Sequence, residues 1–365
     1  MSRGFCVLVG KFLYFNELTN EARRQLTDFQ QRAEGLRAVR ADLRHRYAGS
    51  MSWKVRSDRE YLYRRRGTVE KSLGLRSSKT EEIYRTFSQG RAAAEQLEKG
   101  LRTTLEGMAS VNRALRLDRV PKLVGRVLRR LDDAGVLGDQ VCVVGTNALF
   151  AYEAYAGIRF ESGLLATGDV DIALDARRNL GLAAKAMPTG LLGLLRKIDP
   201  SFSTQEKGAF RAVNASGFMV DLITPEPKER MASVPPRQRR LGGGSDMTTD
   251  DMEAVEVPRL EMIVDAPRFS AIAMSEDGLP VWISAADPRW WAAHKLWLSN
   301  EPSREPVKRQ RDHAQGIAVA TMLARNWGAV DLTDEALASI PIAMRTALRD
   351  AVGQAAADDT QRPEW

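Results

Sequence analysis

Three aspartates carry the chemistry that this sequence suggests most directly. Asp169 and Asp171 stand one residue apart in TGDVDIAL, and Asp221 lies in FMVDLITP. Both stretches are short and apolar, as buried strands are. Because residues i and i+2 of a strand point to the same face, Asp169 and Asp171 would present two carboxylates side by side. Asp221 on a neighbouring strand would complete a cage of three.

Clustered carboxylates repel one another unless a counter-ion lies among them. Oxygen ligands of this kind suit hard divalent cations, so the sequence predicts Mg²⁺ or Mn²⁺ bound by Asp169, Asp171 and Asp221. The chemistry that such ions serve is phosphoryl transfer. An alternative stays open for Asp221, because a carboxylate inside an apolar strand can instead be neutralised by an arginine.

A Gly-Thr pair, Gly145 and Thr146, follows the apolar run VCVV upstream of the aspartates. A glycine after a strand allows a sharp turn and a close approach of phosphate, and the helix that follows offers free amides at its positive end. The Thr146 hydroxyl would add a further ligand. Both residues are therefore candidates for binding phosphate, although any turn from strand to helix can carry such a pair.

A small sheet is needed to hold these residues together. Apolar runs and helical spacing alternate between residues 141 and 224, which favours an α+β fold with a small mixed sheet flanked by helices. The expected strands cover 141–144, 169–174, 209–214 and 217–223, and further strand-like pieces lie at 254–264, 269–274 and 279–283. The expected helices cover 119–135, 147–156 and 178–197.

The first third of the chain is predicted to be helical with a β-hairpin. Residues 19–46 show helical spacing throughout, so we expect one long amphipathic helix there, a candidate surface for a homodimer. Alternating side chains around Ser57 and Asp58 predict the hairpin, and helical spacing returns over 79–116. We accordingly divide the chain into a basic helical region with a hairpin (1–118), an α/β core that contains the three aspartates (119–285) and a C-terminal helical domain (286–365).

Positive charge is concentrated in that first third. Residues 1–140 hold 29 Lys and Arg against 17 Asp and Glu, a net charge of +12, whereas the remaining residues carry −5. This asymmetry indicates a polyanionic partner such as nucleic acid, with a solvated helical surface as the alternative. Aromatic residues also interleave with arginines through the hairpin, as contact with a single strand of RNA requires. A strand core with solvated charges on its outer face produces the same pattern.

The composition is that of an ordinary globular protein, with 44% hydrophobic and 28% charged residues. No segment approaches the ~20 unbroken apolar residues that span a bilayer. We therefore expect a cytoplasmic protein with no membrane partner.

The motifs together resemble the DNA polymerase β-like nucleotidyltransferase superfamily. Its pattern is an apolar strand, a Gly-small pair at a helix start, Asp-x-Asp on the next strand and a third Asp on a later one. The resemblance covers residues 141–224. In GTNALFAYEAYAG, TGDVDIALD and KRQRD the chain is similar to a bacterial branch of nucleotidyltransferase-fold proteins.

By this resemblance Gly145 and Thr146 would hold the triphosphate of an NTP. Asp169 and Asp171 would bind both metal ions, and Asp221 would bind the catalytic metal and help to activate the attacking hydroxyl. The resemblance also implies two further triphosphate ligands on the C-terminal helices, Lys295 and Lys308. An exposed, salt-bridged helix face is the alternative for the segment around Lys308.

Two features depart from the superfamily pattern. Thr146 stands where serine is commoner, and the connection between Thr146 and Asp169 is longer than in compact members.

The leading hypothesis is metal-dependent transfer of a nucleoside monophosphate from NTP to a hydroxyl acceptor, with RNA as the favoured acceptor. The alternatives are a catalytically silent relative that binds nucleic acid or serves assembly, and transfer onto a protein or a small molecule.

Overall fold

The computed structural model describes residues 14–175, 187–226, 240–242 and 251–360. The chain folds into two compact units. Unit 1 comprises Met1–Asn20, Arg119–Ser275 and Val281–Trp365, and unit 2 comprises Glu21–Asp118 and Glu276–Pro280. The residues assigned to the core and to the C-terminal domain thus lie mainly in unit 1, and those of the basic region lie mainly in unit 2.

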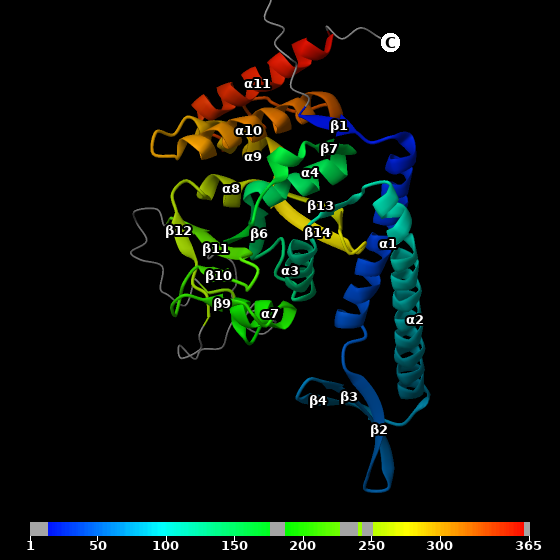
Figure 1. Ribbon diagram of the computed structural model, residues 1–365. Coiled ribbons are helices and arrows are strands. Elements are labelled where there is room, and N and C mark those ends of the chain that lie inside the picture. Colours follow the sequence, from blue (N-terminus) through cyan, green and yellow to red (C-terminus); the bar gives the residue numbers. More distant parts are fainter. Residues whose placement is uncertain (1–13, 176–186, 227–239, 243–250, 361–365) are drawn as a thin grey trace, which may run out of the picture. The chain divides into compact units, whose positions relative to one another are not determined.

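A six-stranded mixed sheet forms the centre of unit 1 (Figure 1). Its strands run in the order β6-β8-β11-β10-β9, and β12 pairs with β11. The bounds are β6 (Val141–Val144), β8 (Asp169–Leu174), β9 (Ser203–Thr204), β10 (Arg211–Val213), β11 (Met219–Pro225) and β12 (Val255–Val257). β8 runs antiparallel to β6 and parallel to β11. The predicted α+β class, a small mixed sheet flanked by helices, is confirmed.

Strands β6 and β8 have the bounds that the sequence predicted, 141–144 and 169–174. All four residues of β6 are buried, which explains why its sequence is apolar without alternation. In β8 the buried Val170 and Ile172 alternate with the half-buried Asp169 and Asp171. Ala173 and Leu174, at the end of the strand, are both buried. This alternation leaves both acids on one face of the sheet, as the sequence predicted.

The helices around this sheet differ in places from the prediction. The predicted helix 147–156 begins earlier, as the 3₁₀ helix η1 (Gly145–Ala148), and continues as α4 (Leu149–Ala156). Helix α3 (Lys122–Asp133) lies within the predicted helix 119–135 and begins after Pro121. Of the predicted helix 178–197, residues 178–186 lie outside the described residues, and α7 spans Gly190–Ile198.

The predicted strand over 254–264 is wrong in its second half. β12 ends at Val257, Arg259 adopts a positive φ of 60°, and α8 (Glu261–Asp265) follows. The apolar run Met262, Ile263, Val264 forms a short, largely buried helix in place of a strand. Periodicity cannot distinguish the two in so short a run.

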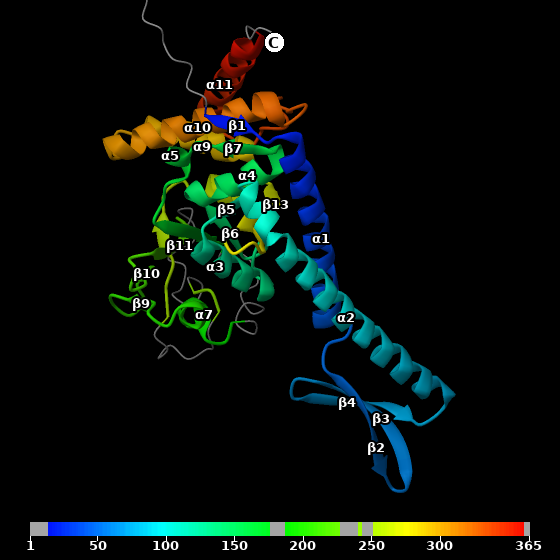
Figure 2. The same cartoon turned by 45° about the vertical axis from the view of Figure 1, so that its right-hand side comes forward.

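The rest of unit 1 consists of two smaller sheets and a group of C-terminal helices. The small strands are β1 (Phe15–Glu17), β5 (Asp118–Val120), β7 (Ile158–Phe160), β13 (Arg268–Ser275) and β14 (Pro280–Ala286), and a short helix α5 spans Ser162–Leu165. Helices α9 (Pro288–Ser299), α10 (Pro306–Asn326) and α11 (Ile342–Thr360) pack together, as Figures 1 and 2 show. Among the described residues, no helix has the length and apolar character that crossing a membrane requires.

Unit 2 is built from two long helices and a three-stranded sheet. Helix α1 (Asn20–His45) matches the predicted helix, and it runs antiparallel to α2 (Ser78–Ala114), with Gly35 against Leu101. The predicted hairpin is confirmed as β2 (Ser50–Arg56) and β3 (Arg59–Arg66), with a positive φ at both Ser57 and Asp58, as a tight two-residue hairpin turn requires. A third strand, β4 (Val69–Leu75), extends the hairpin. Its residues are mostly exposed, so its sequence VEKSLGL carries little of the alternation that marks a strand.

Candidate active site

The three aspartates meet on two neighbouring parallel strands. β8 and β11 pair so that Asp171 lies opposite Asp221 and Asp169 lies opposite Met219. Residues paired across a sheet point to the same face, about 4.8 Å apart. Asp169, two residues before Asp171 on β8, shares that face. The sheet therefore brings the three predicted metal ligands together on one surface.

Asp171 lies between the other two aspartates, and its surroundings disfavour its ionised form. Burial, followed by the negative charges of Asp169 and Asp221, raises its pKa to about 7, against the opposing effect of Lys295 and Arg211. A carboxylate in this position needs a compensating positive charge in order to be ionised. The donor chemistry of the three side chains, all carboxylate oxygens, fits a hard divalent cation such as Mg²⁺.

Asp221 already has a cationic partner. Arg211 lies directly opposite it across β10 and β11, and donates two hydrogen bonds, from Nε to Oδ1 at 2.7 Å and from Nη2 to Oδ2 at 2.6 Å. Within the described ranges, no three His, Cys, Asp or Glu side chains stand in an arrangement ready to hold a metal ion. The Asp221 side chain is 7% exposed, whereas that of Arg211 is 42% exposed. A cation at Asp221 would have to displace this arginine or share the carboxylate with it.

The backbone of Gly145 lies against the carboxylate of Asp171. It has a φ of +66°, and a Cβ built on it would clash with Oδ2 of Asp171. The backbone at the end of β6 therefore turns directly over the Asp171 carboxylate, which only glycine allows. Trp291 fixes this turn, since its Nε1 donates to the carbonyl oxygen of Gly145 at 3.1 Å.

Thr146 is buried beneath the same turn. Its hydroxyl oxygen accepts a hydrogen bond from Nε2 of Gln315 at 3.2 Å, and the same nitrogen donates to the carbonyl oxygen of Leu164 at 2.7 Å. Asn147 donates from Nδ2 to the carbonyl oxygen of Asp169 at 2.8 Å, which ties the turn to the start of β8. The turn after β6 is thus held in place from α10 and from β8.

The comparison with protein families agrees with this geometry. A family model described as "Nucleotidyltransferase" matches residues 122–340, more than half of the chain, including both aspartate strands and the Gly145 turn. The chain belongs to this nucleotidyltransferase family. No curated protein and no solved structure matches the chain significantly.

The structure separates the two lysines that the resemblance assigned to the candidate site. Lys295 on α9 is buried, its Nζ pairs with Oδ1 of Asp312 at 2.7 Å, and it lies 5.2 Å from the ring centre of Trp291. Burial lowers the pKa of Lys295, and its charge acts on Asp171. Lys308 lies exposed in the first turn of α10, where it pairs with Glu305 at 3.1 Å. Lys295 therefore belongs to the electrostatic surroundings of the acids, and the described contact of Lys308 is a surface ion pair.

The contacts that three residues make in the candidate site were not predicted from the sequence. The residues are Arg211, Gln315 and Trp291. Arg211 had a usable signal, because only Ala215 and Ser216 separate the expected strands 209–214 and 217–223. So short a connection is typical of a hairpin, which would bring Arg211 near Asp221. Gln315 lies 169 residues from Thr146 in the sequence, and no local pattern indicates that contact.

Proposed function

We propose that this chain is a metal-dependent nucleotidyltransferase of the DNA polymerase β-like type. It transfers a nucleoside monophosphate from an NTP to a hydroxyl acceptor, with RNA as the favoured acceptor. The observation that supports this most strongly is the register that sets Asp171 opposite Asp221 and beneath the Gly145 turn, with Asp169 on the same face. Membership of a nucleotidyltransferase family supports the general class of reaction.

The residues that would hold the metal are Asp169, Asp171 and Asp221. Mg²⁺ or Mn²⁺ bound there would neutralise the charge that develops on the triphosphate and favour ionisation of the attacking hydroxyl. The three carboxylates suit this role because they are close in space and because Asp171, between the other two, lacks a hydrogen-bonded cation among the described residues. Arg211 would have to release Asp221 or share its carboxylate with the ion.

The reaction itself would proceed in one displacement. The oxygen of the acceptor hydroxyl forms a bond to the α-phosphorus of the NTP, the bond from that phosphorus to the bridging oxygen breaks, and pyrophosphate leaves with the electron pair. The hydroxyl proton passes to Asp221 and then to solvent. Gly145 and Thr146 would hold the triphosphate. The Thr146 hydroxyl oxygen accepts a hydrogen bond from Gln315, so its O–H could still donate to a phosphate oxygen, beside the backbone amide of Thr146.

A transfer assay tests this proposal directly. The full chain is incubated with each α-labelled NTP in turn, with Mg²⁺ or Mn²⁺ and with total RNA, and label in RNA, protein and small molecules is measured. We expect label in RNA, and its loss in Asp171→Asn and Asp221→Asn. Asp350→Asn is the matched control, because Asp350 is an exposed carboxylate on α11, and it should leave the transfer unchanged.

The outcomes of this assay discriminate between acceptors. Label in protein or in a small molecule would retain the reaction type but reject RNA as the acceptor. Label that persists in Asp171→Asn would reject the site. Lys308→Gln adds a further test. If Lys308 binds the triphosphate, this substitution should raise KM for the NTP several-fold without affecting the fold.

The pairing of Arg211 with Asp221 favours a second candidate, a catalytically silent relative that binds nucleic acid. In that case both hydrogen bonds to Asp221 serve only the stability of β10 and β11. No label in any fraction with any NTP, together with retained RNA binding, would establish this candidate and reject the first.

A further inference from the structure

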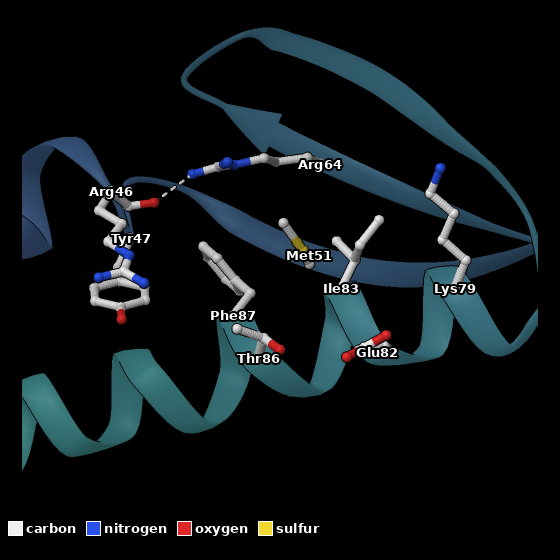
Figure 3. Close-up of a pocket in the computed structure, with 9 residues that line it drawn as sticks. All are labelled: Arg46, Tyr47, Met51, Arg64, Lys79, Glu82, Ile83, Thr86 and Phe87. Carbon is white, nitrogen blue, oxygen red and sulfur yellow. Dashed lines mark hydrogen bonds between the residues drawn. The ribbon is translucent and has the colours of Figure 1, made fainter.

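Unit 2 contains a pocket that the proposed reaction does not use. The pocket has a volume of about 460 Å³ and lies between α2 and the sheet formed by β2, β3 and β4 (Figure 3). Ligand sites for small organic groups have volumes of about 300–1,000 Å³, so a single nucleotide fits the available space. All of its lining residues belong to unit 2.

The walls of this pocket are held by contacts at both of its ends. At one end, Trp53 of β2 packs on Tyr84 of α2, with their ring centres 5.9 Å apart. At the other end, the Tyr47 ring lies against Gly90 so closely that a Cβ on Gly90 would clash with it. The Tyr47 ring also contacts Phe87, with 6.0 Å between the ring centres. These contacts keep the sheet and the helix apart at a defined spacing.

Arg64 provides the best-defined positive charge in this pocket. Its Nη2 donates to the carbonyl oxygens of Arg46 and Ala48, at 2.7 and 3.4 Å, and its guanidinium lies 5.1 Å from the ring centre of Phe87 (Figure 3). Its Nε is buried and lacks a hydrogen-bond partner among the described residues. Carbonyl oxygens orient a guanidinium but do not neutralise its charge, so Arg64 keeps the capacity to bind an anion.

Two further cations line the pocket, against one acid. Lys79 stands exposed in the first turn of α2, where the positive end of the helix dipole adds to its charge, and Arg46 stands at the opposite end. Among the described lining residues Glu82 is the single carboxylate, so their side chains carry a net charge of +2. Figure 3 shows Lys79 and Ile83 projecting from α2 toward the sheet. The pocket is therefore suited to phosphate.

Apart from Thr86, the remaining described lining is mainly apolar and includes flat surfaces. Phe87 and Tyr47 supply aromatic rings, and Met51 and Ile83 supply apolar side chains from β2 and α2. Ile83 is 36% exposed, which is high for an isoleucine that faces a pocket. Aromatic rings beside arginine and lysine form the combination that binds a base and its phosphate in single strands.

We propose that this pocket binds one nucleotide of a single-stranded nucleic acid. The base lies against Phe87, Met51 and Ile83, and the adjoining phosphates contact Arg64 and Lys79. A strand suits the surroundings better than a free nucleotide does. Residues 21–118 hold 22 Lys and Arg against 13 Asp and Glu, a net charge of +9, and Glu276 and Asp277 reduce the charge of unit 2 to +7. This inference rests on the proposed function only in that the bound strand would be the RNA acceptor.

Binding of a fluorescein-labelled single-stranded oligouridylate by the full chain, followed by anisotropy, tests this proposal. Lys79→Gln should weaken binding about 3- to 10-fold and reduce the salt dependence by the equivalent of about one phosphate contact. Ile83→Glu should weaken binding at least as much, because it places a charge against the base. Both residues are exposed, so the fold should tolerate both changes. Lys99→Gln is the matched control, an exposed lysine of the same helix outside the pocket, and should bind like the unaltered chain.

The outcomes separate this inference from the proposed reaction. Asp171→Asn should bind the oligonucleotide with unchanged affinity, so failure to transfer and failure to bind are distinct results. A 4-thiouridine-substituted strand should crosslink to peptides from α2 and β2. Equal affinity of Lys79→Gln, Ile83→Glu and Lys99→Gln would overturn the proposal. So would binding of free uridine monophosphate in the absence of any binding of the strand.

Discussion

Arg211 and Asp221 face each other across β10 and β11 and share two parallel hydrogen bonds, at 2.7 and 2.6 Å. The aspartate is the more buried partner, and the arginine is the more exposed one. A bidentate pair of this kind satisfies both carboxylate oxygens. A divalent cation at the proposed site would bind the same carboxylate, so the positively charged arginine and the ion would compete for Asp221.

This competition predicts the behaviour of Arg211→Gln. In the presence of EDTA the buried Asp221 loses its partner, and the free energy of unfolding should fall by about 1–3 kcal/mol. With saturating Mn²⁺, much of that loss should be recovered, because the ion stabilises only the folded state. Urea denaturation with EDTA and with Mn²⁺ measures both values. Arg102→Gln, which breaks an exposed ion pair with Glu106, should change little in either condition. An equal loss with and without Mn²⁺ would mean that no ion replaces Arg211.

Gly145→Ala should damage both the fold and the transfer reaction. A positive φ alone costs a residue with a side chain about 1–2 kcal/mol, and the new methyl group would also clash with Asp171. Gly135→Ala is a close control, since Gly135 has a φ of +70° and open space where a Cβ would lie. We expect Gly145→Ala to lower the free energy of unfolding further than Gly135→Ala and to abolish transfer. Equal stability and equal activity of the two variants would show that the turn does not have to approach Asp171 closely.

Asp312→Asn should be among the most destabilising single changes in unit 1. The Asp312 side chain is fully buried and accepts from Lys295 at 2.7 Å and from Arg304 at 2.8 Å. Its loss would leave the buried Lys295 ammonium without its partner, which costs about 3–5 kcal/mol. Chemical denaturation should show this loss, whereas Lys308→Gln on the same helix should stay within about 0.5 kcal/mol of the unaltered chain. A loss below about 1 kcal/mol in Asp312→Asn would show that Lys295 finds another partner.

Glu153 predicts a pH dependence of stability. It is buried on α4, and burial raises its pKa to about 7, although Arg119 lies 2.9 Å away and opposes the shift. A carboxyl group whose pKa is raised on folding binds protons more tightly in the folded state, so stability falls as the pH rises from about 4.5 to about 7. A shift of this size corresponds to on the order of 3 kcal/mol.

Glu153→Gln provides the comparison for that pH dependence. Because glutamine does not titrate, the free energy of unfolding of this variant should decline less steeply between pH 5 and pH 7 than that of the unaltered chain. Urea denaturation across that range gives the difference in slope directly. Parallel curves for the two proteins would show that Glu153 keeps an ordinary pKa in the folded chain.

The sequence by itself determined the elements on which the site is built. Strand 169–174 could be predicted to the residue because alternation places Val170 and Ile172 in the core and the aspartates on the opposite face. The long helix at 19–46 and the turn at Ser57 and Asp58 follow from equally local rules. Patterns of this kind can be read from a single sequence because they involve residues that are close together in the chain.

Only the tertiary structure decided what surrounds the aspartates. Strand pairing set Arg211 onto Asp221, and packing of α10 brought Gln315 to the Thr146 hydroxyl across 169 residues. Lys295 and Lys308 looked equivalent in sequence, yet one is buried against Asp312 and the other lies at the surface. The physical reason is that burial and partner choice depend on which segments meet in space. Those contacts join residues that are distant in the sequence, and no local pattern links them.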